Sequence, residues 1–149
     1  MNSPVLLQLN KVLKDNLAAI SQYFLHARLL KHMQLVEMAD YEYKESIQHM
    51  KHADILVERI LSIGGIPNMQ ELSAINVGEC LESILQYDWE LEQTICKSLQ
   101  DAVFVCDNEN DHVSSDMIVK MLENGKEHIR FIQDRIMNQP EKCVDSVVT

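Results

Sequence analysis

Apolar residues recur at alternating steps of three and four residues along four long stretches of this chain. An α-helix completes a turn in 3.6 residues, so this spacing places the apolar side chains on one side of a helix. The predicted helices cover about residues 4–34, 38–63, 79–108 and 112–138. The pattern therefore predicts an all-α fold.

The connections between the predicted helices are short, long and short. Ser3 and Pro4 suit the start of the first helix, and Gly64-Gly65 suits the end of the second. Residues 64–78 carry no long periodic pattern and form the long middle connection. Such a crossover is typical of the ferritin-like four-helix bundle, whereas a simple up-and-down bundle has three short loops.

The length of 149 residues suits one domain with a sizeable core. Only four Gly and three Pro occur, which favours long helices. We expect a single ferritin-like domain over residues 1–149, with the bundle at about 4–138 and a short C-terminal tail at 139–149.

The net charge of −10 argues against a nucleic-acid partner, because no cluster of basic residues would neutralise the phosphates. No apolar run approaches the roughly 20 residues that cross a bilayer, and the N-terminus lacks the features of a signal peptide. The four cysteines show no CxxC pairing, which argues against a zinc framework. We therefore expect a cytoplasmic protein with neither a nucleic-acid nor a membrane partner.

Several residues near the middle of the helices interrupt the apolar stripes. They are Asn16, His49, His52, Glu92, Gly125 and His128. A buried ionisable group is costly unless it is paired or bound to a metal. One buried His with a local hydrogen bond is unremarkable, but three His and a Glu on converging faces favour a site for iron or zinc. A polar cluster that contains water is the alternative.

Five segments resemble bacterioferritin: residues 21–28 (SQYFLHAR), 45–47 (ESI), 50–54 (MKHAD), 58–61 (ERIL) and 65–68 (GIPN). The resemblance extends over all four helices, from about residue 5 to 136, without a gap. It implies a subunit of a 24-subunit cage that stores iron as a mineral core.

The resemblance also implies where a di-iron site would lie. That site takes one Glu from each of two helices and a Glu-x-x-His pair from each of the other two. Three of the six matching positions have changed here, because Asn16, His49 and Gly125 stand where the family has Glu. We therefore assign no catalytic residue and expect the chain alone to be inactive as a ferroxidase. The remaining candidates for a single metal ion are His49, His52, Glu92 and His128.

Met50 directly follows His49, so it lies about 100° around the helix and points away from the bundle interior. A Met on such a face usually fills a packing gap. By resemblance, however, Met50 matches the residue that binds haem b on the two-fold axis between paired subunits. The other positions that match the family's haem site are Ile20, Phe24, Tyr43, Ile47 and Lys51.

The resemblance then implies a haem-binding subunit that transfers electrons for the release of stored iron. Because three di-iron ligands are lost, we expect co-assembly with a second ferritin-like subunit that is competent as a ferroxidase. A ferredoxin-type protein is a candidate electron donor. Two alternatives stay open: a homo-oligomeric bacterioferritin with ferroxidase activity at an atypical metal site, and a structural cage subunit with neither activity.

Overall fold

The structure is a computed structural model that describes residues 3–138, so the predicted tail lies outside the described residues. The observed helices are α1 (Pro4–His32), α2 (Val36–Ser62), α3 (Leu81–Asn108) and α4 (His112–Met137). Each predicted helix is present, with its ends within two residues of the expected positions. The described residues contain no β-strand.

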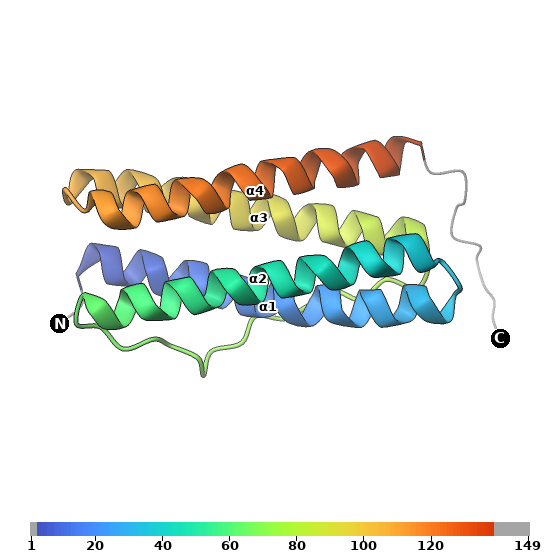
Figure 1. The fold of residues 1–149 in the computed structure, drawn as a ribbon, viewed down its shortest axis with the longest axis horizontal. Coiled ribbons are helices and arrows are strands. Elements are labelled where there is room, and N and C mark those ends of the chain that lie inside the picture. Colours follow the sequence, from blue (N-terminus) through green and yellow to red (C-terminus); the bar gives the residue numbers. More distant parts are fainter. Residues whose placement is uncertain (1–2, 139–149) are drawn as a thin grey trace.

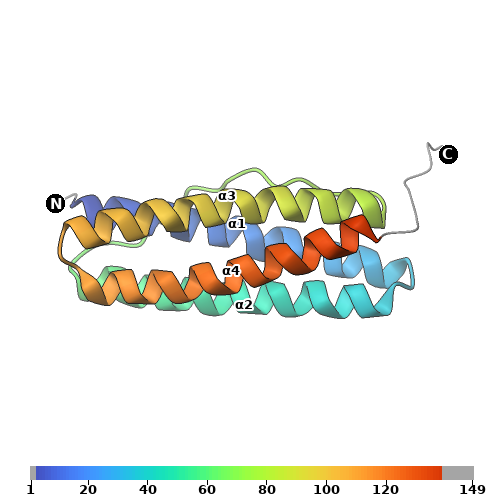
Figure 2. The same cartoon turned by 90° about the horizontal axis from the view of Figure 1, so that it is seen from above.

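The helices form two antiparallel pairs, α1 with α2 and α3 with α4 (Figure 1). The connection between α2 and α3 runs along the length of the bundle, as Figures 1 and 2 show. Because it returns the chain to the opposite end, α2 and α3 point in the same direction. This is the ferritin-like topology expected from the long middle connection, and the prediction is confirmed.

Local capping fixes several helix ends. The Ser3 hydroxyl accepts a hydrogen bond from the Leu6 amide at 3.1 Å, as the Ser-Pro start predicts. Asp111 caps α4 by accepting from the Ser114 amide at 3.0 Å. Asp111 also pairs with Arg59 near the end of α2, at 2.8 Å, and thereby ties the two helices together.

Gly78 ends the crossover at a place where no side chain fits. A Cβ atom at this position would lie 2.4 Å from the backbone nitrogen of Ile84. The absence of a side chain lets the crossover pack directly against the first turn of α3.

The core consists of two apolar clusters with a layer of buried polar residues between them. The first cluster includes Leu9, Leu13, Leu56, Ile60, Leu99 and Ile118. The second includes Leu30, Met38, Ile84, Leu85 and Ile132. On α2, α3 and α4, the buried polar residues of this layer fall between the residues that enter the two clusters. The polar layer is therefore the part of the interior whose side chains can bind a metal ion or exchange a proton.

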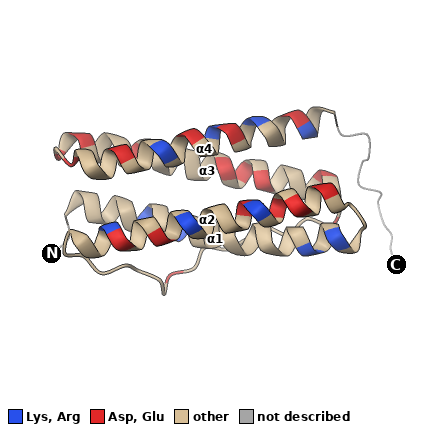
Figure 3. Ribbon diagram, in the orientation of Figure 1, with Lys and Arg blue, Asp and Glu red and all other residues tan. Residues whose placement is uncertain are grey.

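Charged positions are spread along all four helices (Figure 3). Both signs alternate along α2 and α4, whereas α3 is mainly acidic. No described helix is both long enough and apolar enough to span a membrane.

Candidate metal centre

All four helices contribute to a polar cluster in the middle of the bundle. Tyr23 comes from α1, His49 from α2, Glu92 from α3 and His128 from α4, and all four are at most 5% exposed. The structure therefore brings together three of the four residues expected as metal ligands, at the depth expected.

His49 lies between two oxygen atoms. Its Nδ1 is 2.8 Å from Asn16 Oδ1, and its Nε2 is 2.8 Å from Glu92 Oε2. The Asn16 amide nitrogen donates to the Val12 carbonyl, which leaves Oδ1 as an acceptor. Both nitrogens of His49 must then donate, so the ring is an imidazolium cation. Burial lowers the pKa of His49, but the Glu92 carboxylate together with the Glu45 and Asp88 charges outweighs burial and raises the pKa.

Glu92 is the acceptor at the centre of the cluster. Its Oε2 accepts from the Tyr23 hydroxyl at 2.6 Å and lies 3.7 Å from His128 Nε2. Burial raises the pKa of this carboxyl, but the His49 cation and its hydrogen bond outweigh burial and lower the pKa to about 2. The carboxyl is thus ionised and paired with His49. Its other oxygen, Oε1, is buried without a hydrogen-bond partner.

His128 is held between two tyrosines. Its Nε2 lies 3.0 Å from the Tyr23 hydroxyl, and its Nδ1 contacts the Tyr41 hydroxyl. The Tyr23 hydroxyl donates its hydrogen to Glu92, so its oxygen can only accept from His128. His128 Nε2 therefore donates to Tyr23, and His128 Nδ1 accepts from the Tyr41 hydroxyl. His128 is therefore neutral, in keeping with burial as the main cause that lowers its pKa.

His52 lies at the edge of the cluster, with its ring centroid 5.8 Å from that of His49. Its Nε2 is 2.9 Å from the Gln48 amide nitrogen and 3.4 Å from that of Asn124. Burial and the nearby His49 charge lower the pKa of His52 to about 4. It does not contact Glu92, so the four expected ligands do not form one closed set.

Gly125 leaves the side of α4 that faces Glu92 without a side chain. A Cβ atom here would lie 2.9 Å from Cys96 Sγ and 3.8 Å from Glu92 Oε1. The thiol of Cys96 thus occupies the room that a larger residue at position 125 would need. The space left in the cluster is about 10 Å³, which holds at most one water-sized particle.

Two contacts of the cluster were not predicted. Tyr41 contacts His128, and Glu45 Oε1 lies 3.5 Å from His128 Nδ1. Burial raises the pKa of Glu45 to about 7. Glu45 falls on the interior stripe of the second helix, which was a usable signal. Tyr41 lies four residues before Glu45 and so falls on the same side of α2, a signal that helical spacing offered and that was not used.

The residues matched to a haem site lie on a different surface, over α1 and α2. Met50 is 53% exposed, Phe24 47% and Tyr43 39%. The rings of Phe24 and Tyr43 are 6.4 Å apart, and the Arg28 guanidinium lies over both rings. The remaining residues of this group are Ile20 and Ile47, which are partly buried, and Lys51, which is exposed. We call these six haem-site candidates the α1–α2 patch: Ile20, Phe24, Tyr43, Ile47, Met50 and Lys51.

A four-helix bundle with a long crossover and a mid-bundle layer of His, Glu and Tyr defines a ferritin-like protein, and comparison with known proteins agrees. The family model for the ferritin-like domain matches residues 6–139. The bacterioferritin of Brucella melitensis is 33% identical over 132 residues, which is 89% of this chain and 82% of the relative. A bacterial ferritin of Synechocystis is 33% identical over 138 residues, 93% of this chain and 88% of the relative.

The bacterioferritin of Mycobacterium leprae is 30% identical over 132 residues, which is 89% of this chain and 83% of the relative. The chain belongs to the ferritin-like family, in its bacterioferritin branch. This membership supports iron storage as its general role and self-association as its mode of assembly.

Proposed function

We propose that this chain is the haem-binding subunit of a bacterioferritin iron-storage cage. In this role it mediates electron transfer for the release of stored iron and is inactive as a ferroxidase. A second, ferroxidase-competent subunit shares the cage and oxidises the incoming iron. The proposal rests on two consecutive residues of α2 that face in different directions. His49 lies in the interior as a cation, and Met50 is exposed on the α1–α2 patch.

The interior cluster supports the loss of ferroxidase activity. The His49 cation neutralises Glu92, which is the task of a metal ion in a di-iron site. Gly125 supplies no ligand, and the space in the cluster, about 10 Å³, holds at most one water-sized particle. A continuous series of hydrogen bonds links Tyr41, His128, Tyr23, Glu92 and His49. Most of the cluster is thus satisfied without a metal.

The α1–α2 patch fits a haem group. Met50 presents a thioether, which is an established axial ligand of haem iron, and more than half of its surface is open to a partner. Phe24 and Tyr43 place two partly exposed aromatic rings on the same surface, next to the Arg28 guanidinium. In a two-fold dimer, one such Met from each subunit supplies both axial positions. Haem bound there would supply one-electron redox chemistry.

The first test measures iron oxidation by cages that contain this chain alone. We expect ferrous iron to be oxidised no faster than in buffer, and we expect the rate to rise when a ferroxidase-competent bacterioferritin subunit is co-expressed. Oxidation by the single-subunit cage at the rate of an intact family member would overturn the proposal.

The second test uses Met50→Leu, with Met69→Leu as the matched control. Met69 lies in the crossover and is 50% exposed, close to the 53% of Met50. After expression with excess haem, Met50→Leu cages should lose the haem absorption band, whereas Met69→Leu cages should keep it. Equal haem content in the two variants would exclude Met50 as the ligand.

One observation favours the alternative of a homo-oligomeric ferroxidase with an atypical site. Glu92 Oε1 is buried without a partner and leaves one position at which an ion would gain a ligand. In that case Glu92→Ala or His52→Ala would abolish iron oxidation by the chain alone. The same assay therefore separates the two functions.

A further inference from the structure

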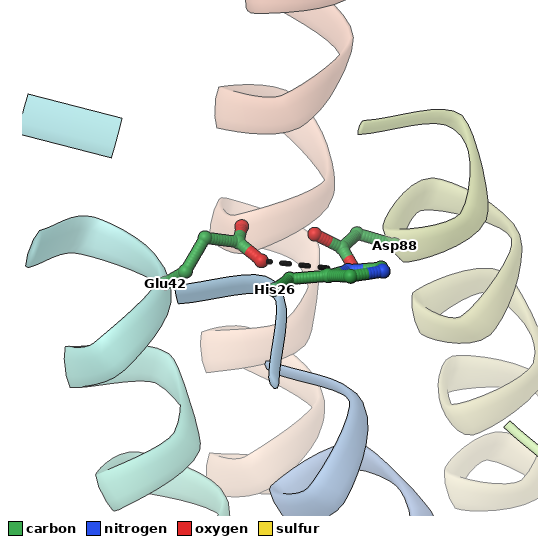
Figure 4. Close-up of side chains that lie close together, drawn as sticks. All are labelled: His26, Glu42 and Asp88. Atoms are coloured by element: carbon green, nitrogen blue, oxygen red, sulfur yellow. Dashed lines mark hydrogen bonds and ion pairs between the residues drawn. The ribbon is translucent and has the colours of Figure 1, made fainter. Parts of the chain in front are cut away.

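A second group of buried ionisable side chains lies in the polar layer, next to the candidate metal centre. It consists of His26 from α1, Glu42 from α2 and Asp88 from α3, and each is 0% exposed (Figure 4). His26 Nδ1 is 2.8 Å from Asp88 Oδ1 and 3.9 Å from Glu42 Oε1. One ligand-type atom from each residue lies within 4.8 Å of the other two. We call this group the His26 cluster.

The His26 cluster lacks the hydrogen bonds that satisfy the candidate metal centre. Both oxygens of Glu42 and Oδ2 of Asp88 are buried without a partner. No Lys or Arg among the described residues pairs with either carboxylate. Two ionised carboxylates without a cation are very costly in a protein interior. A cation, either a metal ion or a proton, is therefore needed between them.

His26 does not supply that cation. Its Nε2 accepts a hydrogen bond from the Gly78 amide at 3.0 Å, so the proton of the neutral ring is on Nδ1. That proton is donated to Asp88 Oδ1, which also accepts from the Gln22 amide nitrogen at 3.0 Å. Both donors reach the same oxygen of Asp88. No donor from the protein reaches Asp88 Oδ2 or the Glu42 carboxylate, and these two carboxyl groups hydrogen-bond to each other only when one of them holds a proton.

We propose that Glu42 and Asp88 bind a divalent cation of the oxygen-preferring class, such as Mn²⁺, between their free oxygens. Carboxylates are the ligands that such ions prefer. The two carboxylates balance the charge of one divalent ion. His26 and Gln22 act as positioning residues, because their hydrogen bonds to Oδ1 turn Oδ2 toward Glu42. The site is separate from the candidate metal centre and does not depend on the proposed function.

A proton is the competitor for this position. Burial, and then the Asp88 charge, raise the pKa of Glu42, so without a metal ion Glu42 holds a proton. Metal binding displaces that proton to solvent. Because the protein supplies three free oxygens, fewer than the usual six ligands, we expect an exchangeable ion instead of a permanent structural one.

The residues that position Asp88 also hold the end of the crossover. Besides the bond from Gly78 to His26, the Gln22 side-chain oxygen accepts from the Asn76 amide at 3.2 Å. An ion that fixes Asp88 therefore also fixes the place where the crossover meets α3. Binding should protect the amides of Asn76 and Gly78 from hydrogen exchange.

The site can be tested with Mn²⁺, because a tryptophan lies next to it. Trp89 follows Asp88 and is the only tryptophan in the chain. Paramagnetic Mn²⁺ bound to Asp88 should quench its fluorescence. Iron-free cages would be titrated with Mn²⁺, and free Mn²⁺ would be measured by electron paramagnetic resonance. We expect saturable quenching with one Mn²⁺ per chain in addition to any bound elsewhere.

Glu42→Gln and Asp88→Asn should each abolish the quenching and remove one bound Mn²⁺ per chain. In each variant the new side-chain amide can donate a hydrogen bond to the remaining carboxylate, so these variants should fold. The matched control is Glu45→Gln, one turn along α2 beside His128, which should keep the quenching. Absence of saturable quenching in the unmodified protein would show that the pair holds only a proton. Quenching that survives in Glu42→Gln, or that is lost in Glu45→Gln, would also overturn the proposal.

Discussion

His49 Nε2 lies 2.8 Å from Glu92 Oε2, and the side chains of this ion pair are at most 6% exposed. The cation at the centre of the bundle is thus part of the chain. His49 stands at a position where the family resemblance implies a metal-binding carboxylate. The substitution reverses the sign of the charge at that position, and Glu92 is already satisfied on one oxygen by His49 and Tyr23.

Glu92→Gln should destabilise the protein strongly. It leaves the buried His49 without its anion, and breaking a buried ion pair typically costs about 3–5 kcal/mol. Thermal unfolding of iron-free cages at a fixed protein concentration should show a clearly lower midpoint. Glu90→Gln, an exposed substitution on the same helix, is the control and should leave the midpoint nearly unchanged. Equal midpoints for the two variants would contradict a charged pair.

The His49–Glu92 pair should make stability depend on pH at both ends. The pKa of His49 is raised above 6.5 in the folded state, so its contribution is full below pH 6.5 and is lost as pH rises through the raised pKa. The pKa of Glu92 is lowered from 4.5 to about 2, so its contribution is full above pH 4.5 and is lost as pH falls toward 2.

The stabilisation by this pair should therefore be largest between about pH 4.5 and 6.5. The measurement is the difference in unfolding midpoint between the unmodified protein and His49→Gln across pH 3–9. Taking the difference from His49→Gln removes most of the pH dependence that other titratable groups contribute. A difference that does not change with pH would show that His49 is neutral in the folded protein.

Gly125 and Cys96 should be coupled. Gly125→Ala removes a helix-interior glycine, which by itself gains about 1 kcal/mol. The new Cβ would lie 2.9 Å from Cys96 Sγ, and such overpacking costs about 1–3 kcal/mol. We expect Gly125→Ala to lower stability in the unmodified protein and to raise it in a Cys96→Ala background. A double-mutant cycle in urea measures the coupling, and additive effects would exclude the contact.

The helices and their order could be predicted from sequence because they depend on local pattern. Apolar spacing fixed the four helices to within two residues, and Ser3-Pro4 and Gly64-Gly65 fixed two ends. The identity of His49, Glu92 and His128 as mid-bundle residues also followed, because helical spacing places them on the interior stripes. His52 is on the same stripe, but its hydrogen bonds to Gln48 and Asn124 draw its ring to the edge.

The contacts between helices could not be predicted in the same way. Asp88 falls on an interior stripe, but only the packing of α1, α2 and α3 brings it to His26 and Glu42. Tyr41 reaches His128 across 87 positions of sequence. Such pairs depend on the distance and rotation of neighbouring helices, which no local pattern specifies.

The sequence by itself determined the helical bundle, its long crossover and the residue types available in its interior, because helical periodicity and glycine positions act over a few residues. The tertiary structure decided how those residues share their protons. His49 faces two acceptors and is therefore charged. His128 faces one donor and one acceptor and is therefore neutral. No donor from the protein reaches Glu42. Protonation follows from which atoms meet in space, and in this protein those atoms come from different helices.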